Sequence, residues 1–300
     1  MSISVQHISK SFKEVQALKD ISFEVNEGEL YGLIGPDGAG KTTLFRILTT
    51  LLFANEGTAT VAGFDVVNDY KKIRHSVGYM PGRFSLYQDL TVEENLTFFA
   101  TIFGTTIEEN YDLIKDIYVQ IEPFKTRRAG KLSGGMKQKL ALCCALIHKP
   151  KVLFLDEPTT GVDPVSRKEF WEMLKRLQKK GITILVSTPY MDEAALCDRI
   201  ALIQDGKILK INTPEAIVEQ YQKTIYDVGA DNMYLLIISL NKYASKHSVY
   251  PFGEFVHYTD TQESFNPKDL EQFLQKQGLK NINITLTKAT IEDVFMDLAK

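Results

Sequence analysis

The sequence has few cysteines and no strong imbalance of charge. Its 300 residues include three cysteines, and none of them stands in a C-x-x-C pair, so neither a disulfide scaffold nor a zinc ribbon is expected. So few cysteines, odd in number, fit a protein of the reducing cytosol. A net charge of −3 gives no general attraction to nucleic acid, and we expect no nucleic-acid partner.

Long apolar stretches and a leader segment are also missing. The longest apolar run, residues 233–240, has the length of a strand and falls well short of the roughly 20 residues that a membrane-spanning helix needs. Residues 1–5 lack the basic start and apolar stretch of a signal peptide. If the protein works at a membrane, we expect another chain to span it.

The most informative stretch is residues 35–42, G-P-D-G-A-G-K-T, which fits the pattern G-x-x-x-x-G-K-[ST]. An apolar run at 30–34 predicts a strand before it, and the spacing at 43–52 predicts a helix after it. Glycines let such a loop turn its backbone N–H groups toward phosphate oxygens, and the helix adds the positive end of its dipole. Lys41 can reach the outer phosphates, and the Thr42 hydroxyl can hold Mg²⁺. We therefore predict a nucleoside triphosphate site formed by Gly35, Pro36, Asp37, Gly38, Ala39, Gly40, Lys41, Thr42 and Thr43.

Two acids follow the apolar run 152–155, and this run predicts a buried strand. In an open parallel sheet the carboxyl ends of the strands face the ligand. There Asp156 can act on the Mg²⁺ held by Thr42, and Glu157 can polarise the attacking water. Acids at a strand end are as often part of a solvated turn, but these follow the phosphate loop by about 115 residues. Glu157 and Lys41 are the predicted catalytic residues.

Residues 132–138, L-S-G-G-M-K-Q, form a third motif. Ser133 can cap a helix, and Gly134 and Gly135 expose backbone N–H groups beside it. The motif therefore predicts a second anion site, about 90 residues after the first. An ordinary glycine-rich helix start is the alternative.

Strands and helices alternate through residues 1–221, an order that predicts an α/β domain with a mostly parallel sheet. Residues 83–148 are expected to form a helical subdomain, in which Thr91 heads a capping box. Residues 222–300 are more aromatic and alternate on a shorter scale, so we expect a small α+β accessory domain there.

Together the three motifs resemble those of the nucleotide-binding subunits of ATP-binding cassette (ABC) transporters. The loop, the 132–138 segment, the acidic strand end and G-V-D-P at 161–164 follow the family's order and spacing, and the resemblance covers residues 2–220. It implies a P-loop NTPase that binds ATP and Mg²⁺ and dimerises head to tail with a second ATPase subunit, identical or different. The residues implied to contact the partner's ATP are Ser133, Gly134, Gly135 and Gln138, and Asp163 would lie at the dimer seam.

The resemblance also implies roles for an aromatic residue and for two further segments. Phe12 falls where the family places an aromatic that stacks on adenine, with an ordinary core residue as the alternative. Residues 83–87 and the helices after them match the part that docks on an integral membrane permease. Residues 289–295 are similar to the end of ATPase subunits from exporters of drugs, antibiotics or polysaccharides. The implied protein hydrolyses ATP on the cytoplasmic, inner face of the cell membrane and drives a separate permease.

Three positions depart from the family pattern. Gly82 stands where the family usually has a glutamine that contacts Mg²⁺, and Pro189 where it usually has a histidine that contacts the γ-phosphate. Hydrolysis could be slow, Thr188 or Tyr190 could replace the lost contact, or the chain could pair with a different ATPase subunit and contribute one weak site. We favour a functional but modified ATPase. Asp37, where asparagine is commoner, is expected to lower phosphate affinity slightly.

Two other classes of function fit part of the sequence. A soluble ATPase of the same fold could act in DNA repair or on the ribosome, but the first kind carries a long coiled coil and the second two cassettes, and we find neither. A nucleotide-binding sensor without hydrolysis stays open because of Gly82 and Pro189.

Overall fold

The computed structural model describes residues 1–82, 86–262 and 264–299. It divides the chain into two compact units, Met1–Pro214 and Glu215–Lys300. Composition placed the boundary at 221/222, after the short helix α7 (Pro214–Glu219). In the structure all but the first residue of that helix belongs to the second unit.

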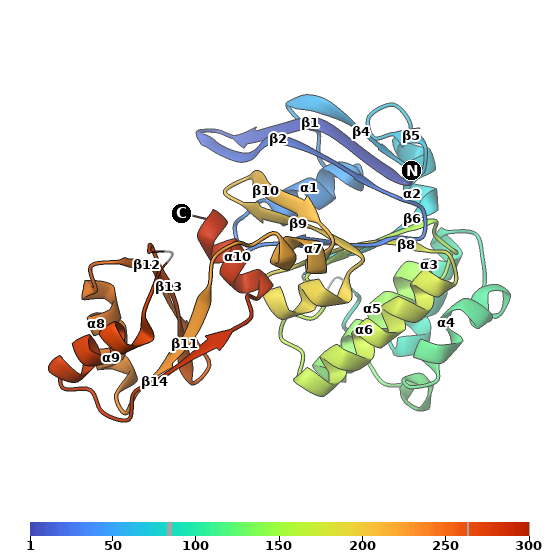
Figure 1. Cartoon of the computed structure of the whole chain (residues 1–300). Helices are drawn as coiled ribbons and strands as arrows, with labels where there is room; N and C mark the ends of the chain where they lie inside the picture. Colours follow the sequence, from blue (N-terminus) through green and yellow to red (C-terminus); the bar gives the residue numbers. More distant parts are fainter. Residues whose placement is uncertain (83–85, 263, 300) are drawn as a thin grey trace. The chain divides into compact units, whose positions relative to one another are not determined.

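The first unit is built on a six-stranded sheet with the strand order β10-β9-β3-β8-β7-β6 (Figure 1). Five of its strands are parallel, and β10 pairs antiparallel with β9 at one edge. These strands are β3 (Leu30–Ile34), β6 (Val77–Met80), β7 (Val152–Asp156), β8 (Thr183–Thr188), β9 (Arg199–Gln204) and β10 (Lys207–Asn212). The expected α/β fold with a mostly parallel sheet is confirmed.

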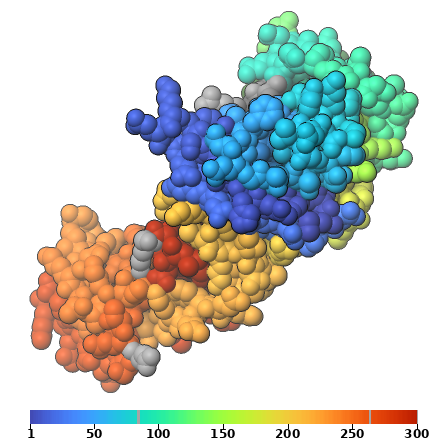
Figure 2. Space-filling view, turned by 90° about the horizontal axis from the view of Figure 1, so that it is seen from above, coloured from blue at the N-terminus to red at the C-terminus, as the bar shows by residue number. Residues whose placement is uncertain are grey.

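A second, antiparallel sheet has the strand order β2-β1-β4-β5. Its strands are β1 (Ile3–Phe12), β2 (Val15–Val25), β4 (Glu56–Val61) and β5 (Phe64–Asp65). In β4 and in the second half of β2, buried and exposed side chains alternate, as in a strand with one face on the core. Seen from above in Figure 2, this N-terminal part, blue to cyan, makes up much of the visible surface of the first unit.

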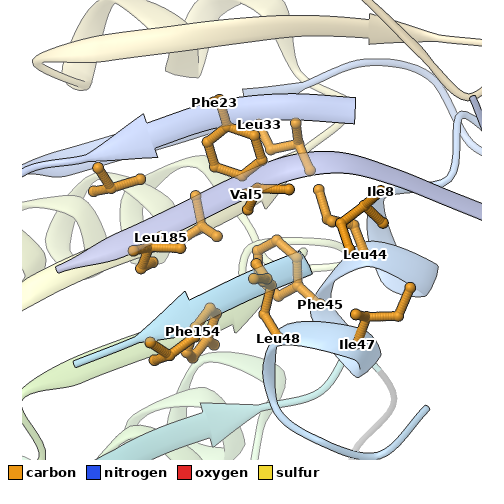
Figure 3. Close-up of a cluster of buried hydrophobic side chains, with 14 of the residues drawn as sticks. Val5, Ile8, Phe23, Leu33, Leu44, Phe45, Ile47, Leu48, Phe154 and Leu185 are labelled. Atoms are coloured by element: carbon orange, nitrogen blue, oxygen red, sulfur yellow. The ribbon is translucent and has the colours of Figure 1, made fainter. Parts of the chain in front are cut away.

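Helix α1 (Lys41–Leu48) packs between the two sheets. Figure 3 shows its Leu44, Phe45 and Leu48 directed into the core, and the ring of Phe45 meets that of Phe154 edge to face, with 5.8 Å between centroids. Burying a side chain of this size stabilises the fold by about 1.5–3 kcal/mol. Core packing on both sides thus fixes the helix whose first residue follows the glycine-rich loop.

Further helices cover the opposite face of the central sheet and form the helical part of this unit (Figure 1). They are α3 (Val92–Ile102), α4 (Tyr111–Tyr118), α5 (Gly134–Leu146) and α6 (Pro164–Lys179), with α2 (Tyr70–Ser76) beside β5 and β6. The capping box at Thr91 is confirmed, because its side chain accepts a hydrogen bond from the Glu94 backbone and its backbone donates to the Glu94 side chain. Helices α3 and α4 are separated by a segment that begins with Gly104 in a left-handed conformation (φ 67°).

The second unit is an α+β domain with its own core. Its elements are β11 (Ile225–Gly229), α8 (Met233–Lys242), β12 (Lys246–Phe252), β13 (Phe255–Asp260), α9 (Pro267–Lys276), β14 (Asn283–Thr287) and α10 (Ile291–Leu298). Up to β14 they follow the β-α-β-β-α-β order of ferredoxin-like domains, with the antiparallel strand order β12-β13-β11-β14. The apolar run of residues 233–240 lies in helix α8. No helix in the described ranges combines the length and apolarity that a membrane crossing needs.

Candidate functional site

The glycine-rich loop joins β3 to α1, and contacts with two carbonyl groups impose its shape. A Cβ atom at Gly35 would lie 2.0 Å from the Ile203 carbonyl oxygen, and one at Gly40 would lie 2.5 Å from that of Ala17. Gly40 also has a φ of 102°, and Gly38 one of 81°, in the left-handed region that favours glycine. The loop therefore turns tightly against its neighbours and leaves its tip, residues 36–38, exposed.

The start of helix α1 is open to an anion. Its N-cap is Gly40, no side chain caps it, and its first turn contains no acid. The backbone N–H groups of a first helical turn carry the positive end of the helix dipole. Thr42 and Thr43, both half-buried, lie in this turn. The geometry suits an anionic group held at the end of the loop.

Lys41 turns its side chain back under the loop and is only 3% exposed. Its Nζ donates hydrogen bonds to the carbonyl oxygens of Gly35 at 2.7 Å and Pro36 at 2.9 Å, and it lies 3.0 Å from Glu157 Oε1. Three oxygens thus compensate the buried ammonium, as a buried charge requires. Oxygens of a bound phosphate could take the place of any of them.

The two predicted acids lie on the same edge of the sheet as the loop, because only β8 separates β3 from β7. Asp156 ends β7, is 2% exposed, and accepts a hydrogen bond from Ser187 Oγ at 2.7 Å. Glu157 follows in a left-handed conformation (φ 51°), and its backbone N–H donates to the Ser187 carbonyl oxygen at 3.1 Å. This turn brings the Glu157 carboxylate to Lys41, so the structure brings together Lys41, Asp156 and Glu157.

The departure at Gly82 lies beside Asp156. A Cβ atom at Gly82 would lie 3.0 Å from the Asp156 carbonyl oxygen and 3.9 Å from its carboxyl carbon. A side chain at this position would therefore lie next to the buried carboxylate. The residue is exposed, and its φ lies outside the left-handed region.

Pro189, the second departure from the family pattern, directly follows β8. Thr188 and Tyr190, which could replace the histidine contact, both make other contacts. Thr188 is fully buried, and its hydroxyl donates to Glu193 Oε2 at 2.5 Å and accepts from the Tyr190 backbone N–H at 3.1 Å. The Tyr190 ring lies under the guanidinium of Arg167, 4.2 Å from its carbon to the ring centroid. The partners of Glu193 escaped the sequence analysis, because no local pattern relates this acid to them.

The glycine-rich segment at 132–138 begins α5 as expected. Ser133 is its N-cap and accepts a hydrogen bond from the Met136 backbone N–H at 3.3 Å. Ser133 and Gly134 are exposed, whereas Gly135 packs so closely on α6 that a Cβ atom would lie 2.8 Å from Ser166 Oγ. Gln138 is half-buried and lines a small pocket beside this contact.

Residues 132–138, called the signature segment below, do not approach the glycine-rich loop of their own chain. Helices α1 and α5 lie on opposite faces of the central sheet (Figure 1). Among the residues that the structure describes, no hydrogen bond or ion pair joins Ser133, Gly134, Gly135 or Gln138 to residues 35–43. The exposed residues of this segment, Ser133 and Gly134, therefore lie apart from the loop of their own chain.

Asp163 is exposed and forms the N-cap of α6. Its Oδ1 accepts hydrogen bonds from the backbone N–H groups of Ser166 at 3.0 Å and Val165 at 3.1 Å. The bond from Ser166 is the main reason that the pKa of Asp163 lies below its usual value. The carboxylate therefore stays charged where α6 begins.

Two expectations concern residues further from the loop. Phe12, at the end of β1, is 45% exposed, so it is not an ordinary core residue, and Lys10 Nζ lies 5.4 Å from its ring centroid. Of the segment 83–87, residues 83–85 lie outside the described residues. Leu86 is buried, and the Tyr87 backbone exchanges hydrogen bonds of 3.0 Å with the Asn95 side chain.

Comparisons with known proteins agree with this geometry. A family profile described as "ABC transporter" matches residues 18–160. Over 99% of its length the chain is 38% identical to the probable multidrug ABC transporter ATP-binding protein YbhF of Escherichia coli K12, and it spans about half of that relative (52%). It is 34% identical to the Nod factor export ATP-binding protein I of Burkholderia lata over 99% of this chain and 96% of that one.

A solved structure has the same fold as the first unit. It is the dimeric post-hydrolysis state of the ATP-binding cassette MJ0796 bound to ADP and Pi, with a TM-score of 0.64 and 25% identity. The match covers 70% of this chain and 98% of the cassette. The similar sequences, the shared fold and the meeting of the glycine-rich loop with the two acids all support the same family assignment. The chain belongs to the family of ABC transporter ATP-binding proteins.

Proposed function

We propose that this chain is the ATP-binding and ATP-hydrolysing subunit of an exporter. The observation that carries the proposal is the meeting of Lys41, Asp156 and Glu157 at one sheet edge, beside an uncapped helix start. A buried ammonium next to the open end of a helix suits the β- and γ-phosphates. The exposed ring of Phe12 is the proposed platform for adenine, since an aromatic face with one side in solvent can stack on a base.

The residues fit a bound Mg²⁺. A hydroxyl at Thr42 and a carboxylate at Asp156 are the oxygen donors that this ion prefers, and Asp156 is already buried and oriented by Ser187. We propose that these two residues hold the ion, Asp156 through water. A magnesium ion at this place supplies neutralising charge for the phosphate oxygens.

Glu157 is the proposed general base. Its carboxylate lies at the rim of the loop and is only partly buried, so water can reach it. A base must stand within hydrogen-bond reach of the water that it activates. The left-handed turn at Glu157 places it on the loop side of the sheet edge, where the terminal phosphate would lie.

A second ATPase subunit is proposed to complete each site. The exposed Ser133 and Gly134 do not reach the loop of their own chain, and a signature of backbone N–H groups at a helix start suits the phosphates of a partner's ATP. Asp163 would lie at the seam between the two subunits. The MJ0796 cassette, which shares the fold, was solved as a dimer with ADP and Pi.

A separate membrane permease is the proposed partner on another face. A groove of about 300 Å³ lies between the central sheet and the helical part. Its apolar and aromatic lining includes Tyr79, Leu86, Phe99 and Phe103. Such a groove suits the apolar side of a helix. The chain would then work at the inner, cytoplasmic face of the cell membrane, and the names of YbhF and of the Nod factor protein favour export.

The rate of hydrolysis is proposed to be reduced. Gly82 has no side chain beside Asp156, and Thr188 and Tyr190 are engaged in other contacts. This leaves two of the three explanations: a slow site, or pairing with a different ATPase subunit. A sensor that binds nucleotide without hydrolysis is the second candidate, and the missing donor at Pro189 is the observation that favours it.

An ATPase assay on the purified chain, with and without Mg²⁺, tests the enzyme. We expect turnover in the wild type and a fall of at least about 100-fold in Lys41→Ala, since that change removes the phosphate-binding cation. Lys72→Ala is the matched control, because this lysine is exposed and makes only surface contacts with Asp69 and the Phe64 ring among the residues that the structure describes. Equal ATPase rates in the wild type and in Lys41→Ala would contradict hydrolysis by this chain and would support the nucleotide-binding sensor instead.

The transporter role is tested by expressing the tagged chain together with the proteins encoded beside it, extracting the membranes with detergent and identifying what co-purifies. A membrane protein with many spans that co-purifies in near-equal amount would support it. A soluble dimer without any such protein would contradict it.

A further inference from the structure

Glu193 carries a buried carboxylate that has no role in the mechanism proposed above. It lies in the 3₁₀ turn η4 (Met191–Leu196) after β8 and is 2% exposed. Its Oε1 accepts a hydrogen bond from Thr159 Oγ1 at 2.8 Å, and its Oε2 accepts one from Thr188 Oγ1 at 2.5 Å. Arg167 Nη2 lies 3.1 Å from Oε1. A carboxylate is buried at this depth only when hydrogen bonds and a cation compensate its lost hydration.

Two of these partners lie on the edge of the sheet that carries the nucleotide site. Thr159 is itself buried and follows Glu157 by two positions. Thr188 ends β8 directly before Pro189. Because Glu193 accepts a hydrogen bond from each hydroxyl, it joins the segment after β7 to the segment after β8.

The third partner connects the same carboxylate to helix α6. Arg167 stands four residues after Asp163, the N-cap of that helix. Its guanidinium pairs with Glu193, stacks on the Tyr190 ring and lies 3.4 Å from Asp192. The first turns of α6 and the chain after β8 are therefore held to each other at Glu193.

We propose that Glu193 is a positioning residue for hydrolysis. Through Thr159 it holds the segment that carries Glu157, and through Arg167 it fixes this segment to the start of α6, where the partner subunit would meet it. Through Thr188 it also ties the chain after β8, which begins with Pro189, to the end of that strand. The inference rests on the proposed ATPase function.

The test compares variants of the full chain by kcat, KM for ATP, nucleotide Kd and Tm. For Glu193→Ala we expect kcat to fall by about 10- to 100-fold, because a small displacement of the base slows proton transfer strongly. KM and Kd should change by less than about threefold, since phosphate binding does not involve this residue. Glu193→Gln keeps one acceptor oxygen and should recover part of the lost kcat.

Asp192→Asn is the matched control. Its side chain is 76% exposed, and Arg167 at 3.4 Å is its contact in the same network. We expect kcat of this variant to stay within about twofold of the wild type, as a solvent-exposed ion pair contributes little.

A folded Glu193→Ala protein with the kcat of the wild type would overturn the inference. So would a fall in kcat matched by an equal fall in the stoichiometry of ATP binding, since this would show loss of folded protein rather than of positioning. If Glu193→Ala does not fold, Thr159→Val, which removes one hydroxyl, decides in its place: an unchanged kcat overturns the inference, and a reduced kcat at unchanged Kd supports it. If the wild type and Lys41→Ala hydrolyse ATP at equal rates, the proposed ATPase function is wrong, and the role of Glu193 in hydrolysis is wrong with it.

Discussion

The Nζ atom of Lys41 lies 3.0 Å from Oε1 of Glu157, so the cation proposed to bind phosphate and the proposed base form one ion pair. The lysine end of this pair is almost fully buried, where electrostatic attraction is stronger than in water. A phosphate group that approaches Lys41 competes with Glu157 for the same ammonium. We infer that binding of ATP releases the carboxylate and that this release frees it to act on water.

The first prediction uses Glu157→Gln to separate the action of the carboxylate as a base from its competition with phosphate for Lys41. We expect kcat to fall by about 100- to 10,000-fold, because an amide cannot accept the proton. The Kd for ATP should decrease, since the amide competes less for Lys41. A radiolabelled phosphate assay and titration calorimetry give the two quantities. Glu169→Gln, on an exposed acid that pairs with Lys139, serves as control, and weaker ATP binding by Glu157→Gln would contradict the competition.

The second prediction concerns the missing side chain beside Asp156. In Gly82→Gln a Cβ atom would lie 3.0 Å from the Asp156 carbonyl oxygen, a close but relievable contact. The amide would add a ligand group near the proposed Mg²⁺ site, so we expect turnover to rise by about tenfold. Gly82→Ala adds the same Cβ without the amide and should not raise it. Equal turnover in the two variants would show that Gly82 does not limit the rate.

The third prediction tests whether the signature acts on a partner's site. Lys41→Ala and Ser133→Arg should each be inactive alone, because every site of a head-to-tail dimer would lack one component. Co-expressed in equal amounts, they would form mixed dimers in half of the cases, each with one intact site. We therefore expect about a quarter of the wild-type activity to return. No recovery would indicate that the site is completed within one chain or by a different subunit.

The fourth prediction is a pH dependence of stability that arises from His148. Burial lowers its pKa from 6.5, and nearby His75 adds to the effect, although the hydrogen bond to the Val77 carbonyl oxygen acts in the opposite direction. The ring stacks on Phe103 with 3.7 Å between centroids, and its Nε2–H donates to that carbonyl at 3.0 Å. Within the described part of the chain, its Nδ1 has no hydrogen-bond partner, so an added proton would have no acceptor.

The sign follows from the lowered pKa. The unfolded chain takes up the proton more readily than the folded one, so the stabilising contribution is complete above the unfolded pKa of 6.5 and is lost as pH falls below it. We expect the Tm of the wild type to decrease between pH 7.5 and 5.5 and that of His148→Gln to decrease less. Thermal unfolding followed by circular dichroism measures both. An equal decrease in the two proteins would assign the effect to other groups.

Local sequence patterns were sufficient to predict elements whose physical cause lies within a short stretch of the chain. The apolar run of residues 30–34 forms β3 with the expected bounds, and the capping box at Thr91 starts α3. The loop at 35–42 was found because its glycines and Lys41 are neighbours in the chain. In each case the physical cause, an apolar run or a capping side chain, lies within a few residues.

Features that depend on distant partners were not visible in the sequence. Strands β9 and β10 escaped prediction, because β9 owes its place to pairing with β3, about 170 residues earlier in the chain. The ion pair of Lys41 with Glu157 and the partners of Glu193 arise from the order of strands in the sheet, which periodicity does not reveal. Residues 233–240 were judged to have the length of a strand but lie in helix α8, because a short apolar run can form either a strand or a buried helix.

Each of the two units has buried hydrophobic residues of its own, and this separation determines how the chain unfolds. A core cluster in the first unit includes Phe45 and Phe154 around α1, and a core cluster in the second includes Leu236 and Tyr258 beside α8 and α9. Units with separate cores lose their structure in separate cooperative steps. We expect calorimetry to show two transitions, of which ATP raises the one that belongs to residues 1–214. A single melting temperature would then be an average over two thermodynamically distinct bodies, and a substitution in the ferredoxin-like unit could lower it while every nucleotide contact stayed intact.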